Sequence, residues 1–408
     1  MIHFIPGGVC AAQGFSASGI HVGVKANSGD KKDLALIYSE KPCTAAGIFT
    51  RNKVKAAPVR LSQNHVKSGT AQAVAVNSGN ANACAPLENE NALAMCQAAA
   101  QALSLSPEQV LVASTGVIGR TLPIAPIQEG MPVLAEKLAH SPEASDDAAH
   151  AIMTTDTQKK EVAVSFQLEG KEVVIGGIAK GSGMIHPNMG TMLCFLTTDC
   201  AISPALLQKA LTSVGDQSFN RISVDGDTST NDSCIILANG MAGISEIAEE
   251  GPAYEAFCQA LLKVCVHLAR AMAKDGEGAR HLITCTVSGA ESVEQAQALS
   301  KSVISSTLTK AAIFGCDANW GRVLCAMGYA GVDFDPTQVD VTFASQAGKV
   351  TVCQKGQGLP FDEDLARKVL TEDEVEILIT LSQGDAQCTC WGCDITYDYI
   401  KINGDYRT

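Results

Sequence analysis

Residues 180–199, KGSGMIHPNMGTMLCFLTTD, form a glycine-rich loop with one proline that runs into Thr191 and then directly into an apolar strand. The glycines Gly181, Gly183 and Gly190 allow strained or positive-φ backbone conformations. Such a backbone can press a peptide carbonyl toward a neighbouring hydroxyl. The Gly190–Thr191 bond is therefore the candidate for a reaction within the chain itself.

The chemistry of this bond follows from the threonine side chain. A hydroxyl that attacks the preceding carbonyl forms an ester, and hydrolysis of the ester frees an α-amine on Thr191. That amine, with an unperturbed pKa of about 7.7 to 8.0, can accept the hydroxyl proton, so no histidine is required. A simpler interpretation stays open here, because glycine-rich turns before apolar strands are common in proteins of every kind.

The composition is that of a compact globular enzyme. The chain has 408 residues, of which 46% are hydrophobic and 18% charged. This predicts one large or two intimate domains around a substantial core. The formal net charge of -13 would repel phosphate backbones and anionic membrane surfaces, so small molecules are better candidate partners than nucleic acids or lipids.

We expect a soluble, cytoplasmic protein. The segment 1–15 lacks a basic n-region, and Pro6, Gly7 and Gly8 interrupt its apolar residues. No run elsewhere reaches the roughly 18 apolar residues needed to cross a bilayer. The sixteen cysteines are therefore interpreted as reduced thiols.

Hydrophobic periodicity predicts alternating helices and strands, which indicates an α/β or α+β fold. The only linker-like composition is the short acidic segment HSPEASDD at 140–147. Helices are expected at about 88–103, 126–140, 203–213, 253–273, 292–307 and 363–371. Strands are expected at about 34–38, 73–77, 110–113, 161–167, 172–178, 191–197, 233–238, 281–287, 340–345 and 374–380.

The cluster CTCWGC, with Cys388, Cys390 and Cys393, has a spacing that suits either a metal knuckle or a redox pair. A zinc site usually needs four ligands from two separated pairs, and the sequence has no second CxxC and no HxxxH. A buried strand or turn fits the same spacing. Phosphate loops, dinucleotide fingerprints and GxSxG elbows are also missing, so we expect no metal and no cofactor.

Eight motifs follow one another along nearly the whole chain. They are NSGNANAC at 77–84, STGVIG at 114–119, MTTDT at 153–157, KGSGMIHPNMGTML at 180–193, SVDGDTSTND at 223–232, AKDGEGAR at 273–280, GCDANWGR at 315–322 and the terminal WGCDITYDYIKINGDYRT. Together they resemble the ornithine acetyltransferase family, also called the bifunctional glutamate N-acetyltransferase family. Gly190 departs from the family's usual alanine, and Cys316 stands where a charged residue is frequent. Glycine at 190 is expected to ease the strained turn.

The resemblance implies an N-terminal-nucleophile-like fold that cleaves itself between Gly190 and Thr191. The resulting chains, residues 1–190 and 191–408, would stay together, and two such pairs would form a heterotetramer. The implied enzyme moves an acetyl group from N2-acetylornithine to glutamate in arginine biosynthesis. Some members of the family also accept acetyl-CoA as the donor.

The resemblance also assigns roles to single residues. Thr191 would hold the acetyl group as an ester, and Thr115 with Gly116 would form the oxyanion hole. Lys180 suits a substrate carboxylate and Glu277 a substrate amino group. The expected substrate-contacting positions are Thr154, Lys180, Thr191, Glu277, Asn403 and Thr408.

Each assignment has a simpler alternative. STGVIG fits a plain turn, Lys180 and Glu277 fit solvated ion pairs, Thr154 fits a helix cap, and the tail around Asn403 fits a disordered end. SVDGDTSTND lacks the twelfth-position glutamate of an EF-hand, so we expect a structural turn near the site and no calcium loop.

Two other functional classes remain open at this stage. An N-terminal-nucleophile amidase or aminopeptidase would use Thr191 and the same oxyanion donors but pass the acyl group to water. A non-catalytic metal or redox module would instead be centred on Cys388 to Cys393.

Overall fold

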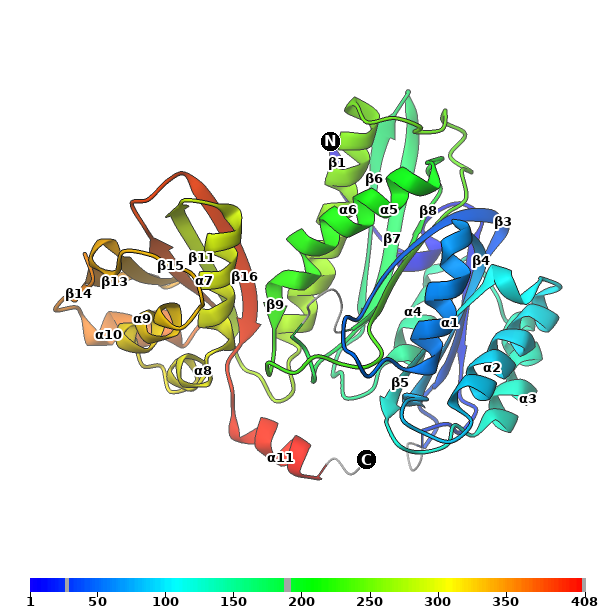
Figure 1. Ribbon diagram of the computed structural model, residues 1–408, viewed down its shortest axis with the longest axis horizontal. Helices are drawn as coiled ribbons and strands as arrows, with labels where there is room; N and C mark the ends of the chain where they lie inside the picture. The colour runs from blue at the N-terminus through cyan, green and yellow to red at the C-terminus, as the bar shows by residue number, and fades with distance from the viewer. Residues whose placement is uncertain (26–28, 187–191, 406–408) are drawn as a thin grey trace.

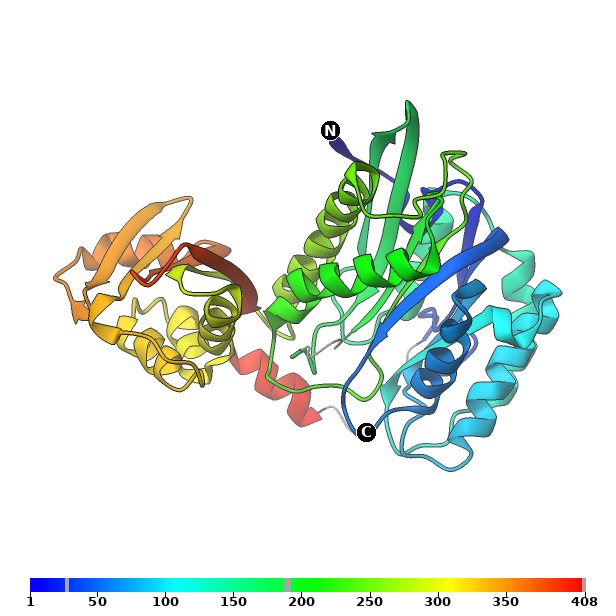
Figure 2. The same ribbon diagram turned by 45° about the horizontal axis from the view of Figure 1, so that its top comes forward.

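The computed structural model describes residues 1–25, 29–186 and 192–405, and these form two lobes (Figure 1). Within the described residues, the larger lobe is built on a nine-stranded sheet and the smaller lobe on a seven-stranded sheet. The last helix, α11 (Tyr397–Asp405), leaves the small lobe and extends back toward the large one (Figure 2). The mixed α/β fold predicted from the sequence is confirmed.

The large sheet has the strand order β1-β6-β7-β8-β10-β3-β4-β5, with β2 paired to β3. Strand β8 lies inside this sheet, antiparallel to β7 and parallel to β10. The bounds are β1 Ile2–Ile5, β2 Phe15–Ile20, β3 Leu34–Phe49, β4 Thr70–Asn80, β5 Val110–Val117, β6 Lys160–Leu168, β7 Lys171–Lys180, β8 Leu193–Thr198 and β10 Ser233–Ala238.

Helices cover both faces of the large sheet, which explains why its central strands are apolar on both sides. In β8, Cys194 and Leu196 pack in the core with α5 and α6, whereas Leu193 and Phe195 pack in the core with α4. A third core lies between α2, α3 and strands β3 to β5. The bounds are α1 Ala57–His65, α2 Glu88–Leu103, α3 Ile124–Glu136, α4 Pro142–Ile152, α5 Pro204–Gln217 and α6 Pro252–Lys274.

Helix α6 is the one described helix that is long and apolar enough to cross a membrane by length and composition. Its residues Leu261, Val264 and Leu268 are fully buried. They pack in the same core as the inward-facing residues of β6 and β7. In this structure α6 is therefore a core helix of the large lobe.

The small lobe has the strand order β14-β13-β12-β15-β11-β16-β9. Cys388, Cys390 and Cys393 lie on β16, where they are buried free thiols paired along β11. The buried-strand interpretation of this cluster is therefore confirmed. The bounds are β9 Ile222–Ser223, β11 Leu282–Ala290, α7 Val293–Ser305, α8 Thr307–Phe314, α9 Trp320–Gly328, β12 Asp340–Ser345, β13 Gly348–Gln354, β14 Gln357–Gly358, α10 Glu363–Leu370, β15 Glu374–Thr380 and β16 Ala386–Cys393.

All six helices and all ten strands expected from periodicity are present, with ends shifted by a few residues or, in β3, an extension to Phe49. The strand expected at 191–197 is observed at Leu193–Thr198, and its expected first residue lies outside the described residues. The segment 140–147, whose composition is linker-like, mostly belongs to helix α4. Ser141 caps helix α4 by accepting a hydrogen bond from the Ala144 amide, and Pro142 occupies the first helical turn. A proline and acidic residues at this position start a helix.

Candidate active site

A cavity of about 190 Å³ opens where β5 and β7 end and where the chain enters β8 and β10. All six described residues to which the resemblance assigned roles line it: Thr115, Gly116, Thr154, Lys180, Glu277 and Asn403. Met192 also lines it. The remaining assigned residues, Gly190, Thr191 and Thr408, lie outside the described residues. A larger cavity of about 550 Å³ between β2, α3 and α4 contains none of these residues.

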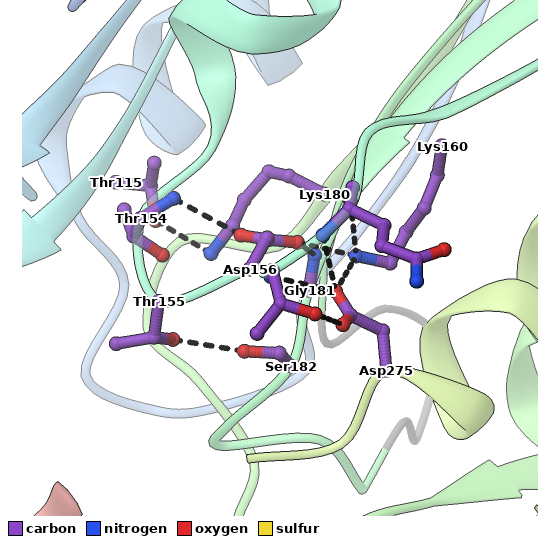
Figure 3. Close-up of polar contacts among 11 residues, drawn as sticks. Thr115, Thr154, Thr155, Asp156, Lys160, Lys180, Gly181, Ser182 and Asp275 are labelled. Atoms are coloured by element: carbon purple, nitrogen blue, oxygen red, sulfur yellow. Dashed lines mark hydrogen bonds and ion pairs between the residues drawn. The ribbon is translucent and has the colours of Figure 1, made fainter. Parts of the chain in front are cut away.

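The hydroxyl of Thr115 faces the ammonium of Lys180 (Figure 3), with 3.4 Å between Lys180 Nζ and Thr115 Oγ1. An ammonium group can only donate, so the hydroxyl accepts here and its own hydrogen remains free to donate elsewhere. An oxyanion donor needs this free hydrogen.

Gly116 lies where β5 runs beside β4, paired with Gly79 at an irregular register. Its φ of +127° belongs to the region that favours glycine, and an added Cβ would lie 2.4 Å from the Gly79 carbonyl carbon. The two strands therefore approach so closely that no side chain fits at position 116. The segment is a constrained strand end and not the plain turn that the sequence left open.

Lys180 is buried, with 8% of its surface exposed. Burial lowers the pKa of its ammonium below the usual range, although the nearby carboxylates of Asp156, Asp232 and Glu277 act in the opposite direction. Glu277 is 9% exposed, so neither residue belongs to a solvated ion pair. The cavity therefore holds one cation next to carboxylates on different elements.

Asp156 ties together the two segments that carry Thr154 and Lys180 (Figure 3). Its carboxylate accepts hydrogen bonds from the Thr154 amide at 3.0 Å and from the Gly181 amide at 2.7 Å. Lys160 donates to both Asp156 and Asp275, at 2.7 and 2.6 Å. Burial acts to raise the pKa of Asp156, but the charges of Lys180 and Lys160 outweigh it and hold the pKa well below its usual range. Thr154 follows the end of α4 and does not cap a helix start.

Helix α11 brings Asn403 to Glu277. Asn403 Nδ2 donates to Glu277 Oε2 at 2.7 Å, and the Glu277 amide donates to the Ser182 carbonyl at 2.9 Å. An added Cβ on Gly183 would lie 2.4 Å from the Glu277 carboxyl carbon, so the loop packs directly against this carboxylate. Asn403 therefore lies at the cavity, hydrogen-bonded to Glu277, and is not part of a disordered tail.

Two further cavity residues, Asn231 and Asp232, were not singled out from the sequence. Asn231 Nδ2 donates to the carbonyls of Ala81 and Ser114, at 2.6 and 2.8 Å, and so fixes the strand directly before Thr115. Asp232 is 2% exposed. The motif SVDGDTSTND does lie at the site, as expected, but only the packing shows which of its polar residues face the cavity.

Thr115 and Lys180 reach this cavity from the ends of β5 and β7, whereas Glu277 and Asn403 reach it from the loop after α6 and from helix α11. A hydroxyl donor beside an ammonium suits a developing oxyanion and a substrate carboxylate. The buried carboxylate of Glu277 suits a substrate ammonium. Among the described residues, no group of three or more His, Cys, Asp or Glu side chains is placed to hold a metal ion.

Comparison with known proteins gives matches over nearly the whole chain. The model of the ArgJ family matches residues 16–408. Arginine biosynthesis bifunctional protein ArgJ 1 of Clostridium acetobutylicum is 51% identical over 97% of this chain and 96% of its own. Arginine biosynthesis bifunctional protein ArgJ of Symbiobacterium thermophilum is 49% identical over the full length of both chains. A crystal structure of argJ from Bacillus halodurans is 40% identical, with a TM-score of 0.50, over 53% of this chain and 100% of the solved chain.

Proposed function

The chain belongs to the ArgJ family, and from this premise we propose that it is the arginine-biosynthesis acetyltransferase that moves an acetyl group from N2-acetylornithine to glutamate. The observation that carries the proposal is the single cavity that unites Thr115, Gly116, Lys180 and Glu277 next to Met192, the neighbour of Thr191. These groups suit an acyl transfer between two amino acids.

The proposed reaction has two half-reactions. The Thr191 hydroxyl attacks the acetamide carbon of N2-acetylornithine while its α-amine takes the hydroxyl proton. Thr115 and Gly116 stabilise the tetrahedral oxyanion, ornithine leaves with the proton, and the acetyl group stays on Thr191 as an ester. The amine of glutamate then attacks the ester and leaves as N-acetylglutamate. No cofactor is needed, because Thr191 carries the acetyl group.

Substrate recognition is assigned to the charged cavity residues. Lys180 binds the α-carboxylate that both substrates share, and Thr154 adds a hydrogen bond. Glu277, oriented by the Asn403 amide, binds the side-chain ammonium of N2-acetylornithine. Thr408 supplies a hydroxyl.

Self-cleavage before Thr191 is part of the proposal, as are the two chains 1–190 and 191–408 and an N-terminal-nucleophile-like fold. Such chains would stay together, because β8 and β10 of the second are inserted between β7 and β3 of the first. The solved Bacillus halodurans chain supports this division, since its whole length is matched by 53% of this chain, the share that 191–408 makes up.

The remaining parts of the proposal concern the assembly and its surroundings. Two cleaved pairs would form a heterotetramer, acetyl-CoA would serve as a second acetyl donor, and the enzyme would work in the cytoplasm. Sixteen free cysteines, with no disulfide among them, support a reducing compartment.

The decisive experiment separates transfer from hydrolysis. The purified protein is incubated with N2-acetylornithine, with and without glutamate, and the products are separated by mass. The proposal expects N-acetylglutamate and ornithine in the presence of glutamate. Free acetate at the same rate with and without glutamate would establish the amidase alternative and overturn the transferase.

A further inference from the structure

Lys160 joins two segments of the chain that lie far apart in the sequence (Figure 3). Its ammonium donates to Asp156 Oδ1 at 2.7 Å and to Asp275 Oδ2 at 2.6 Å. The side chains of Lys160 and Asp156 are 1% and 0% exposed, and that of Asp275 is 10% exposed. Apolar side chains of similar volume often stabilise a fold at least as well as a buried ion pair. The network therefore suggests a use beyond stability, and charge-assisted hydrogen bonds fix the geometry of the groups that they join.

The first of these contacts holds the residues that carry two cavity side chains. Asp156 accepts hydrogen bonds from the Gly181 amide at 2.7 Å and from the Thr154 amide at 3.0 Å. Gly181 directly follows Lys180, whose side chain lines the cavity together with that of Thr154. The ion pair between Lys160 and Asp156 therefore fixes where the backbone presents the Lys180 side chain.

The second contact holds the start of the loop that carries Glu277. Asp275 directly follows the end of α6, and its amide donates to the Ala271 carbonyl at 3.0 Å. Its carboxylate accepts from the Thr157 amide at 3.1 Å as well as from Lys160. Glu277 follows two residues later and lines the cavity. The position of Asp275 therefore bears directly on the position of the Glu277 carboxylate.

The same segments also meet through Ser182, which is 1% exposed. Its Oγ lies 2.9 Å from Thr155 Oγ1, and its carbonyl accepts from the Glu277 amide at 2.9 Å. The segments 154–157, 180–182 and 275–277 are thus linked to one another by buried contacts. Lys160 is bonded to the first and the last of them.

We propose that Lys160 is a positioning residue that sets the spacing between Lys180 and Glu277, and thereby the length of the diamino acid that the cavity accepts. This inference rests on the proposed function, in which Lys180 binds the α-carboxylate and Glu277 binds the side-chain ammonium. The distance between the two groups must then match the side chain of ornithine. A substrate with one methylene more or fewer leaves one of its charges poorly paired, and a site typically discriminates about 10- to 200-fold for one methylene.

A spacing role differs from a purely structural role in what it does to selectivity. If Lys160 only stabilised the fold, its loss would weaken the binding of short, matching and long substrates by the same factor. If Lys160 sets the spacing, its loss allows Glu277 to move relative to Lys180, and the preference for one length falls.

The test measures by calorimetry how tightly the purified protein binds ornithine, its shorter homologue 2,4-diaminobutyrate and its longer homologue lysine. None of these amino acids carries an acetyl group, so binding is measured without turnover. The unaltered protein should bind ornithine about 10-fold or more tightly than either homologue. Asp275→Asn removes the charge that draws Lys160 toward the Glu277 loop but keeps the pair of Lys160 with Asp156. In this variant the preference should fall by about 10-fold, toward equal binding.

The matched control is Asp146→Asn. It breaks the ion pair between Asp146 and Lys159, the neighbour of Lys160, and neither of these residues lines the cavity. This variant should keep the length preference of the unaltered protein.

The outcomes are distinguishable. Equal weakening for all three amino acids or an unchanged preference in Asp275→Asn would overturn the proposal, as would equal or absent binding of the three by the unaltered protein. Should Asp275→Asn unfold at a lower temperature, Lys160→Arg decides, because it keeps the charge on a side chain of different length and shape. A changed preference in Lys160→Arg supports the spacing role, and an unchanged one overturns it.

The proposed function is read separately. A protein that prefers ornithine by length but transfers no acetyl group from N2-acetylornithine to glutamate would refute the proposed function and leave the spacing role of Lys160 in place. A protein that transfers acetyl groups but whose Asp275→Asn variant keeps its length preference would do the reverse.

Discussion

Thr115 and Lys180 lie at the ends of strands in the large sheet, here called the sheet side of the site, whereas Asn403 comes from helix α11, here called the helix side, none of whose residues is buried. The first side is held by strand register, by Asn231 and by the Asp156–Lys160 network. The second side meets the cavity through the hydrogen bond between Asn403 and Glu277. This difference suggests that the reaction depends on the sheet side and recognition on the helix side.

The largest effect is expected from a change of the proposed nucleophile. Thr191→Ala removes the only group proposed to form the acyl ester, so both self-cleavage and acetyl transfer should fall to background. Intact mass measurement should give the uncut chain for this variant and fragments 1–190 and 191–408 for the unaltered protein. Unaltered protein that turns over as one uncut chain would contradict the mechanism.

The second-largest loss of activity is expected from a change on the sheet side. Thr115→Ala removes one oxyanion donor, which typically costs about 10²- to 10³-fold in kcat, or about 2.7 to 4 kcal/mol of transition-state stabilisation. The loss should appear in kcat with little change in KM, because the donor acts on the transition state. Thr115→Ser keeps the hydroxyl and is the matched control. Unchanged kcat in Thr115→Ala would remove this residue from the oxyanion hole.

The two sides were not equally predictable from the sequence. Helix α2 was expected at the bounds it has, 88–103, and its buried residues Ala92, Met95 and Ala99 recur at helical spacing. Helix α11 was not expected, because its apolar residues Tyr397 and Ile400 are exposed and show no core-facing pattern. Motif resemblance found Thr115, Lys180, Glu277 and Asn403 on both sides.

Other features of the site depend on packing, which a single sequence does not show. Asn231 and Asp232 follow a stretch of similar short polar residues, and only the contact with the carbonyl of Ser114 and the unpaired Asp232 Oδ2 distinguish them. The need for glycine at position 116 likewise depends on packing. Its necessity follows from the close approach of Gly79 on the neighbouring strand, which no local pattern contains.

A change of Glu277 is expected to have an effect of intermediate size, smaller than that of Thr115→Ala and larger than that of Asn403→Ala. Glu277→Gln keeps the shape and an acceptor for Asn403 but removes the charge. Loss of one charge-assisted hydrogen bond, about 1.5 to 3 kcal/mol, should raise KM for N2-acetylornithine about 10- to 150-fold. KM for glutamate, which has no side-chain ammonium, should change less. Equal increases for both substrates, measured in steady-state assays, would show that Glu277 does not recognise the ammonium.

The smallest effect on substrate binding is expected from a change in helix α11. Asn403→Ala removes a neutral donor that orients Glu277, and a hydrogen bond of about 0.5 to 1.5 kcal/mol corresponds to a rise of about 2- to 10-fold in KM for N2-acetylornithine. Self-cleavage should keep its normal rate, because the groups proposed for it lie on the sheet side. Lys401→Ala, an exposed change on the same helix, is the matched control and should leave both constants unaltered.

Deletion of residues 405–408 extends this test to the hydroxyl of Thr408. The truncated enzyme should cleave itself completely and bind both substrates more weakly, with kcat closer to normal than in Thr115→Ala. If Asn403→Ala or the deletion slowed cleavage as much as Thr115→Ala does, the two sides would act as one unit. The helix would then help to assemble the reacting groups, because Asn403 binds Glu277, whose amide also donates to the Ser182 carbonyl of the glycine-rich loop.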